Sequence, residues 1–152
     1  MNKNLQKINR SIRKIRKVLM LRKNQVNIEA YLLRKLQQEK SELSQQLEVR
    51  KSQYLSCVED INKTRSSTDR NSIDIYESSL DHVKDSWIET LRSIERMQLK
   101  IDSQKMQLII ARRAEKKMEK LLEGYSRDVK VMSAQEEQKE LDEVSIKRFL
   151  SR

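Results

Sequence analysis

The side chains that could perform acid–base, nucleophilic or metal chemistry are few in this sequence, and they are not grouped. The chain has one histidine, His82, and one cysteine, Cys57. His82 falls at an exposed position of the helical repeat described below, where a solvated side chain is expected rather than a base or a ligand. A lone cysteine is usually a small apolar filler. The adjacent Glu136 and Glu137 lack neighbouring metal ligands. A single glycine excludes a glycine-rich phosphate loop. We therefore expect a protein that is not an enzyme and that binds no cofactor or metal.

A heptad pattern of apolar residues organises most of the chain instead. One block runs from Leu5 to Ile61 and a second from Ile73 to Met132, with apolar side chains at alternating steps of three and four residues. We call these positions the seam; 13 of 17 are apolar in the first block and 15 of 18 in the second. A 3.5-residue repeat of this length predicts a left-handed coiled coil rather than a globular core. Cys57 is itself a seam residue, and a lone thiol suits a reducing cytosol.

The break between the two blocks predicts a turn. Residues 62–72 are rich in Asn, Ser, Thr and Asp, whose side chains compete with the helical backbone and cap helix starts. Asp74 then stands in a predicted first turn, where negative charge is favoured. The predicted fold is all-α, a long antiparallel two-helix coiled-coil hairpin that is monomeric alone. Its helices are expected at 1–61 and 73–135, with a helical or flexible C-terminal overhang at 136–152.

The register of the hairpin follows from the length of the turn, which suggests seam partners whose residue numbers sum to 137. This register places Arg22 opposite Glu115, two opposite charges in an otherwise apolar seam. It also places Arg50 opposite Trp87, where a cation–π contact is expected. These matches favour a hairpin within one chain over a parallel homodimer.

The same register leaves the overhang without a partner, because Leu5 lies opposite Met132. Ser133 followed by Glu136 has the spelling of a capping box, which predicts a separate helical segment there. The overhang carries five apolar residues: Leu141, Val144, Ile146, Phe149 and Leu150.

Positive charge is concentrated at what we call the open end of the hairpin, residues 1–28 together with the overhang 136–152. Residues 1–28 hold nine Lys or Arg and no acid, whereas the remaining residues hold 24 basic and 23 acidic side chains. Such a field steers the open end toward an acidic partner. The alternative explanation is an ordinary solvated helix face.

Nucleic acid and membranes are less favoured as partners of the basic segment. The segment lacks base-stacking aromatics, so only nonspecific attraction to phosphates would remain. It is Arg-rich and acid-free like a transit peptide, but its apolar residues continue the seam without a break. No stretch approaches the roughly 20 apolar residues of a membrane span. We predict no specific nucleic-acid binding and no membrane span.

One stretch near the C-terminus has a recognisable spelling. Residues 135–149 read QEEQKELDEVSIKRF, a charged run around 138–143 followed by a basic and apolar tail. Together with the chain length, the hairpin and the basic N-terminal arm, this stretch resembles the YscO and FliJ family of type III secretion stalk proteins. The YscO-like branch of virulence injectisomes looks closest.

The resemblance implies a non-enzymatic stalk at the cytoplasmic face of the bacterial inner membrane. The open end would enter the hexameric secretion ATPase, the turn end would face the export gate protein, and secretion chaperones would be further partners. The partner-binding residues hypothesised at the open end are Lys3, Lys7, Arg10, Arg13, Lys14, Arg16, Lys17, Gln138, Leu141, Asp142 and Phe149. The gate-facing residues hypothesised at the turn end are Tyr54, Ile61, Ile73 and Tyr76.

Two other functions stay open from the sequence. A self-associating coiled-coil scaffold would use the basic end as an adhesive patch, form oligomers and leave any ATPase unaffected. An RNA-binding helical hairpin would bind through its basic segment, with an affinity that falls steeply as salt is added.

Overall fold

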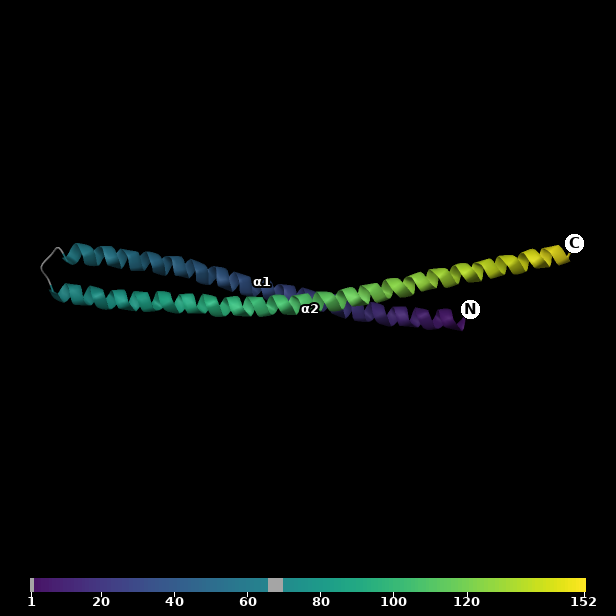
Figure 1. Cartoon of the computed structure of the whole chain (residues 1–152), viewed down its shortest axis with the longest axis horizontal. Coiled ribbons are helices and arrows are strands. Elements are labelled where there is room, and N and C mark those ends of the chain that lie inside the picture. Colours follow the sequence, from purple (N-terminus) through teal and green to yellow (C-terminus); the bar gives the residue numbers. More distant parts are fainter. Residues whose placement is uncertain (1, 66–69) are drawn as a thin grey trace. The chain divides into compact units, whose positions relative to one another are not determined.

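Two long α-helices make up the computed structural model of the chain, which describes residues 2–65 and 70–152 (Figure 1). Helix α1 spans Lys3–Arg65 and helix α2 spans Arg70–Leu150. No strand occurs in the described ranges. The prediction of an all-α coiled-coil hairpin is confirmed. Residues 66–69 of the predicted turn lie outside the described residues.

The helices are longer than the seam pattern predicts. Residues 62–65 belong to α1, and α2 begins at Arg70, so Asp74 falls after its first turn. At the other end, α2 continues through Ser133 to Leu150 without a new helix start. The reason is that the capping spelling at Ser133 acts only where the backbone leaves the helix. No proline is present in the chain, and the one glycine, Gly124, lies within α2 without a positive φ.

Local hydrogen bonds explain where the described helix ends lie. The Asn2 side-chain oxygen accepts a hydrogen bond from the backbone N–H of Asn4 at 3.0 Å, and the Asn2 carbonyl accepts one from the N–H of Gln6 at 3.2 Å. Asn2 is therefore the N-cap of α1. The last turns of both helices carry basic residues, which is the favourable sign at a helix C-terminus: Lys63 and Arg65 in α1, and Lys147 and Arg148 in α2.

The helices pair in two compact units. Unit 1 consists of residues 1–29 and 108–152, and unit 2 of residues 30–107. In unit 1, Asn9 lines a groove with Lys130, whereas Arg22 lines a groove with Ile110, so the two helical segments run antiparallel. The most buried residues of unit 1 come from both segments: Ile12, Ile15, Leu19, Leu108 and Ala111.

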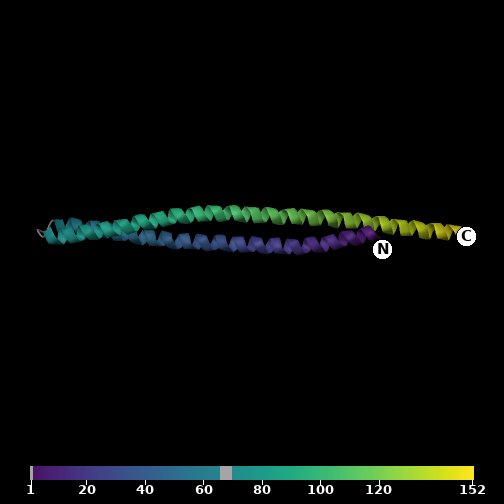
Figure 2. The same cartoon turned by 90° about the horizontal axis from the view of Figure 1, so that it is seen from below.

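Unit 2 pairs the rest of α1 with the first part of α2, again antiparallel (Figure 2). Three contacts join its two segments. The Lys40 ammonium donates to the Gln98 side-chain oxygen at 2.5 Å, Tyr54 contacts Trp87, and Arg65 pairs with Glu77. In the predicted register, the numbers of paired residues sum to 137. The observed partners differ from the predicted ones by one, four and five residues, in that order. The predicted register therefore locates each pairing to within about one and a half helical turns.

Burial follows the predicted seam in each unit. Every seam position is buried or half-buried except Arg22 in unit 1 and Tyr76 in unit 2, which are exposed. No described side chain is completely buried, because two helices alone leave one flank of every seam residue open to solvent. Across residues 2–65 and 70–152, neither helix carries a stretch apolar enough to cross a membrane.

Candidate partner-binding site

The basic residues of the open end all belong to unit 1 and all face solvent. Their spacing places them away from the seam positions Ile12, Ile15 and Leu19, whose burial fixes which face of α1 packs against α2. The hypothesised basic residues are each exposed: Lys3, Lys7, Arg10, Arg13, Lys14, Arg16 and Lys17. None of the seven forms an ion pair within the described part of the chain. Their charge is therefore available to a ligand.

Part of this charge lines a groove between the two helices of unit 1. Arg13 and Arg16 of α1 share the groove with Ser126 and Lys130 of α2, and Ile12 is among the residues that line it. Three cationic side chains therefore line this groove, together with the apolar Ile12 and Val129. This arrangement suits a carboxylate or another anionic group of a partner, because a guanidinium presents its donors in a fixed fork.

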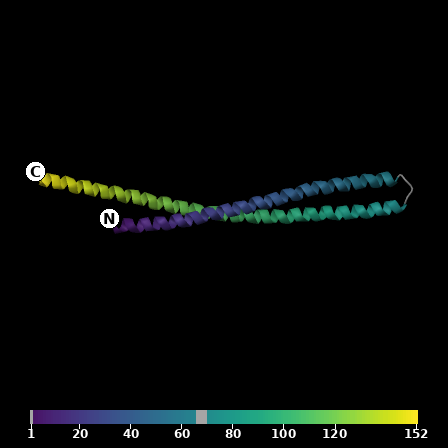
Figure 3. The ribbon, with the colours of Figure 1, turned by 180° about the vertical axis from the view of Figure 1, so that it is seen from behind.

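The overhang lies in the same unit as the basic arm. The C-terminal part of α2 extends beyond the N-terminal end of α1 (Figure 3), and residues 137–152 are all exposed. The side-chain amide of Gln138 donates to the Asp142 carboxylate at 3.0 Å, so these two hypothesised residues form one polar pair on the helix. Leu141 is 62% exposed and Phe149 80%. The open end therefore combines uncompensated positive charge with exposed apolar side chains.

The four residues hypothesised at the turn end belong to unit 2 and are mostly part of its interior. Ile61 is buried, Tyr54 and Ile73 are half-buried, and only Tyr76 is exposed. The Tyr54 ring packs against Trp87 with ring centroids 5.4 Å apart. Three of the four therefore contribute packing within unit 2, and Tyr76 is the one that offers a surface to a partner.

A comparison with protein families bears on what this surface does. A family model described as flagellar FliJ protein matches residues 11–152. The chain belongs to the FliJ family. It is therefore a component of the flagellar and type III protein-export apparatus, in a family of non-enzymatic proteins. No curated protein and no solved structure matches the chain.

Two predicted side-chain contacts are not present in this FliJ-family protein. Arg22 is exposed and makes no ion pair with Glu115 in the described part of the chain. The Trp87 ring contacts Tyr54 instead of the predicted partner Arg50. Tyr54 lies one helical turn after Arg50 on α1. The physical reason is the same in both cases. A long side chain in a two-helix seam can bend toward solvent or toward the next turn, so backbone register alone does not fix its partner.

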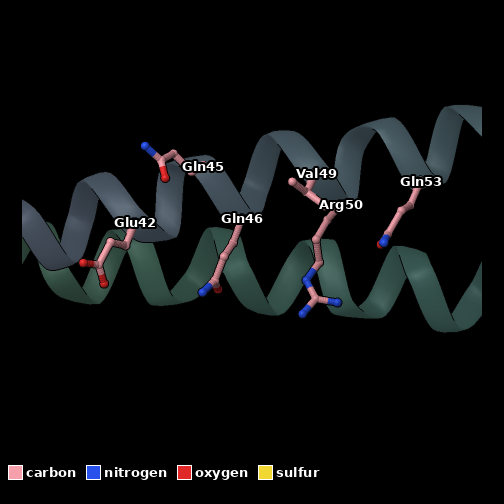
Figure 4. Close-up of a pocket in the computed structure, with 6 residues that line it drawn as sticks. All are labelled: Glu42, Gln45, Gln46, Val49, Arg50 and Gln53. Atoms are coloured by element: carbon pink, nitrogen blue, oxygen red, sulfur yellow. The ribbon is translucent and has the colours of Figure 1, made fainter.

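Arg50 instead borders a groove in unit 2 (Figure 4). Its side chain reaches from α1 toward α2, and its Nε atom is buried without a hydrogen-bond partner. The other lining residues are mainly amides and one acid: Glu42, Gln45, Gln46, Val49 and Gln53. A buried guanidinium N–H without an acceptor destabilises the seam locally. We assign this groove no ligand.

The few residues with catalytic or ligating side chains occupy unremarkable positions in this FliJ-family protein. His82 is exposed on α2, and Cys57 is half-buried in the seam of unit 2. Among the residues that the structure describes, no three His, Cys, Asp or Glu side chains are arranged to hold a metal ion.

A set of exposed apolar residues lies outside the heptad seam. In unit 1, Leu21, Ile28 and Ile110 are more than half exposed, as are Leu55 and Ile75 in unit 2. The unit 1 residues each lie one position before a seam residue in sequence. The sequence contains this second apolar stripe beside the seam, but whether its residues are exposed depends on how the other helix covers them.

Proposed function

We propose that this FliJ-family protein is a cytoplasmic stalk of a bacterial type III secretion system, that its open end binds the hexameric secretion ATPase, and that it links the ATPase to the export gate. The observation that supports the proposal most is the open end itself. Seven exposed basic residues of α1 and the exposed last part of α2 lie in one unit, and none of the seven forms an ion pair within the described residues.

Charge supports an acidic partner at this end. Residues 1–28 carry nine basic and no acidic side chains, so the summed field is long-ranged and accelerates encounter with a negatively charged channel or ring. The exposed Leu141 and Phe149 then supply apolar contact area, which makes a complex last after the encounter.

The coiled coil supplies what a stalk needs mechanically. Two helices with different sequences present a different surface to each subunit of a symmetric ring, so a ring of identical subunits is contacted unequally. Contacts that differ between the conformations of an ATPase subunit shift the population of those conformations. Nucleotide turnover is thereby altered without any catalytic group on the stalk.

The gate contact and the service to secretion chaperones are finer parts of the same proposal. Tyr76, the exposed member of the turn-end set, is the residue we assign to the gate contact. We also propose the injectisome branch of the family, on the spelling of residues 135–149. The family model that matches the chain carries a flagellar description.

The direct test is the turnover rate of the purified secretion ATPase from the same organism, with this protein titrated in at low and moderate salt. We expect stimulation that saturates near one chain per hexamer and that weakens with salt. An unchanged turnover rate, together with separate elution of the two proteins, would contradict the stalk role. Stable oligomers of the chain alone would then support the scaffold alternative.

A further inference from the structure

Unit 1 has a second surface that the stalk role does not use. Several apolar side chains next to the seam stay exposed: Val18, Leu21 and Ile28 on α1, and Ile110 and Leu121 on α2. Ala114, beside them on α2, is half-buried. We call these six residues the apolar face. Leu21 is 67% exposed, Ile110 54% and Ile28 52%, although each is a large aliphatic residue that a solvated helix does not need.

Helix geometry places these six residues on one side of the unit. Each residue of the set precedes a seam position by one, which rotates it by about 100° from the buried interface. Because the two segments run antiparallel, the same offset points to the same side on both helices. Ile110, Ala114 and the seam residue Met118 accordingly line one groove together with Arg22 of α1.

The opposite side of unit 1 is more polar than the apolar face, although Met20 and Ile109 are exposed there. Asn9, Arg13 and Arg16 line the groove there with Ser126 and Lys130. Glu123 borders a neighbouring groove with the same Ser126 and Lys130. Glu123 thus lies on the polar side and Glu115 in the seam, whereas Asp128 precedes the seam residue Val129 and lies on the side of the apolar face, beyond Leu121.

The border of the apolar face is basic. Lys120 precedes Leu121 on α2. Arg22 of α1 and Arg113 and Lys117 of α2 line the groove beside Ile110 directly. An apolar strip flanked on both helices by cations is complementary to a helix that carries apolar residues on one stripe and carboxylates on its edges.

We propose that the apolar face of unit 1 is a docking groove for an amphipathic helix of a partner protein, with acidic residues flanking the helix's apolar stripe. The groove between α1 and α2 supplies the third position of a three-helix arrangement, in which Leu21, Ile28 and Ile110 become buried. A second copy of this chain is disfavoured as the occupant, because two basic borders would then face each other. The proposal does not rest on ATPase binding, because none of the residues assigned to the ATPase contact belongs to the apolar face or lines the groove beside Ile110.

A designed probe tests the groove directly. It is a fluorescein-labelled helical peptide of about five turns, with leucines at seam spacing and glutamates on both flanks. A matched peptide carries lysines in place of the glutamates. The full-length protein is titrated against each, and binding is followed by fluorescence anisotropy. We expect saturable binding of the glutamate peptide and at least about tenfold weaker binding of the lysine peptide.

The chain provides a close control, because neighbouring exposed residues point to opposite sides. The double variant Leu21→Ser with Ile110→Ser alters the apolar face, whereas Met20→Ser with Ile109→Ser alters the side away from it. We expect the first variant to weaken binding at least about tenfold and the second to leave it within about twofold. All four residues are exposed, so both variants should keep the helical circular dichroism spectrum of the wild type.

Three results would overturn the proposal. One is the absence of saturable binding by the glutamate peptide. Another is an equal loss of binding in the two double variants. The third is binding of vesicles of phosphatidylglycerol and phosphatidylcholine that depends on Leu21 and Ile110 while the peptide is ignored, since the face would then be a lipid-binding surface.

Discussion

Units 1 and 2 share the same heptad seam but fill it differently. The most buried positions of unit 1 are aliphatic, from Ile12 to Ala111, whereas those of unit 2 are Ile61, Ile101 and the polar Thr90. The unit 2 seam also contains Lys40 and Arg50, both half-buried. Unit 1 also has polar seam residues, the half-buried Glu29 and Glu115 and the exposed Arg22, so the two units differ in the residues at their most buried positions.

The polar residues of unit 2 are mostly provided with partners. Lys40 donates to the Gln98 side chain, and the amide of Gln98 donates to Asp102 at 2.9 Å. The Thr90 hydroxyl donates to the Ser86 carbonyl one turn earlier at 2.9 Å. Such bonds contribute little net stability but penalise a shifted register, in which Lys40 would lose its acceptor. The aliphatic residues at the most buried seam positions of unit 1 therefore contribute mainly stability, whereas the hydrogen-bonded polar residues of unit 2 favour one alignment of the helices.

The largest effect is expected from a charge placed in the unit 1 seam. Leu19→Asp buries a carboxylate without a partner and should cost about 4 kcal/mol of unfolding free energy, measured by urea denaturation followed at 222 nm. The matched change Leu43→Asp, at a half-buried seam position of unit 2, should cost clearly less. Equal costs would break the distinction between the two seams.

Substitution of Arg50 should change the free energy of unfolding in the opposite direction. Because its Nε is buried without a partner, Arg50→Met should stabilise the protein by about 1–2 kcal/mol. The neighbouring exposed change Lys51→Met is the control and should have an effect within about 0.5 kcal/mol. Destabilisation by Arg50→Met would show that the guanidinium is satisfied in solution.

A smaller gain is expected in unit 1 from its glycine. A Cβ at Gly124 would meet no atom within 4 Å, and the backbone there has no positive φ. Gly124→Ala should therefore raise the free energy of unfolding by about 1 kcal/mol, through the lower backbone entropy of the unfolded chain. A lower melting temperature for the variant would mean that unit 1 departs from a regular helix at this residue.

The smallest effect is expected at the surface of unit 2. Arg65 and Glu77 lie 3.3 Å apart, but their side chains are 60% and 49% exposed. A double-mutant cycle with Arg65→Ala and Glu77→Ala should give a coupling of less than about 0.5 kcal/mol, because solvent screens the pair. A coupling above about 1 kcal/mol would indicate that this pair helps to hold the helix ends together.

The sequence predicts the fold of this protein well because one repeated spacing of apolar residues is enough to specify a coiled coil. Leu19, Leu108 and Ile101 are buried where the heptads place them. The predicted contacts of Arg22 with Glu115 and of Arg50 with Trp87 were wrong, because a long side chain can reach several partners from one backbone position. The separate helical segment predicted to begin at Ser133 is absent for a different reason, since α2 is continuous there. A capping spelling signals a helix start only if the preceding residues leave the helix, and nothing before Ser133 breaks it.

The candidate site was predictable only in part. The distribution of charge located the basic residues within 1–28, and the register placed the overhang at the same end of the hairpin. The apolar face was not found, because exposure depends on which flank of the helix the second segment leaves open. That information requires both helices at once rather than one stretch of sequence.

We propose that the basic residues within 1–28 of unit 1, and not the overall positive charge, bind the secretion ATPase. Two variants of equal net charge separate these possibilities. One replaces Arg10, Arg13, Lys14, Arg16 and Lys17 with glutamine. The other replaces five exposed basic residues of unit 2 with glutamine: Lys35, Lys51, Lys84, Arg92 and Lys100.

The measurement is the turnover rate of the ATPase titrated with the wild type and with each variant in the same buffer. The unit 1 variant should lose most of the stimulation, with a half-saturating concentration raised at least about tenfold, while the unit 2 variant should match the wild type within about twofold. Equal loss in the two variants, or none in the first, would contradict the assignment of the open end to the ATPase.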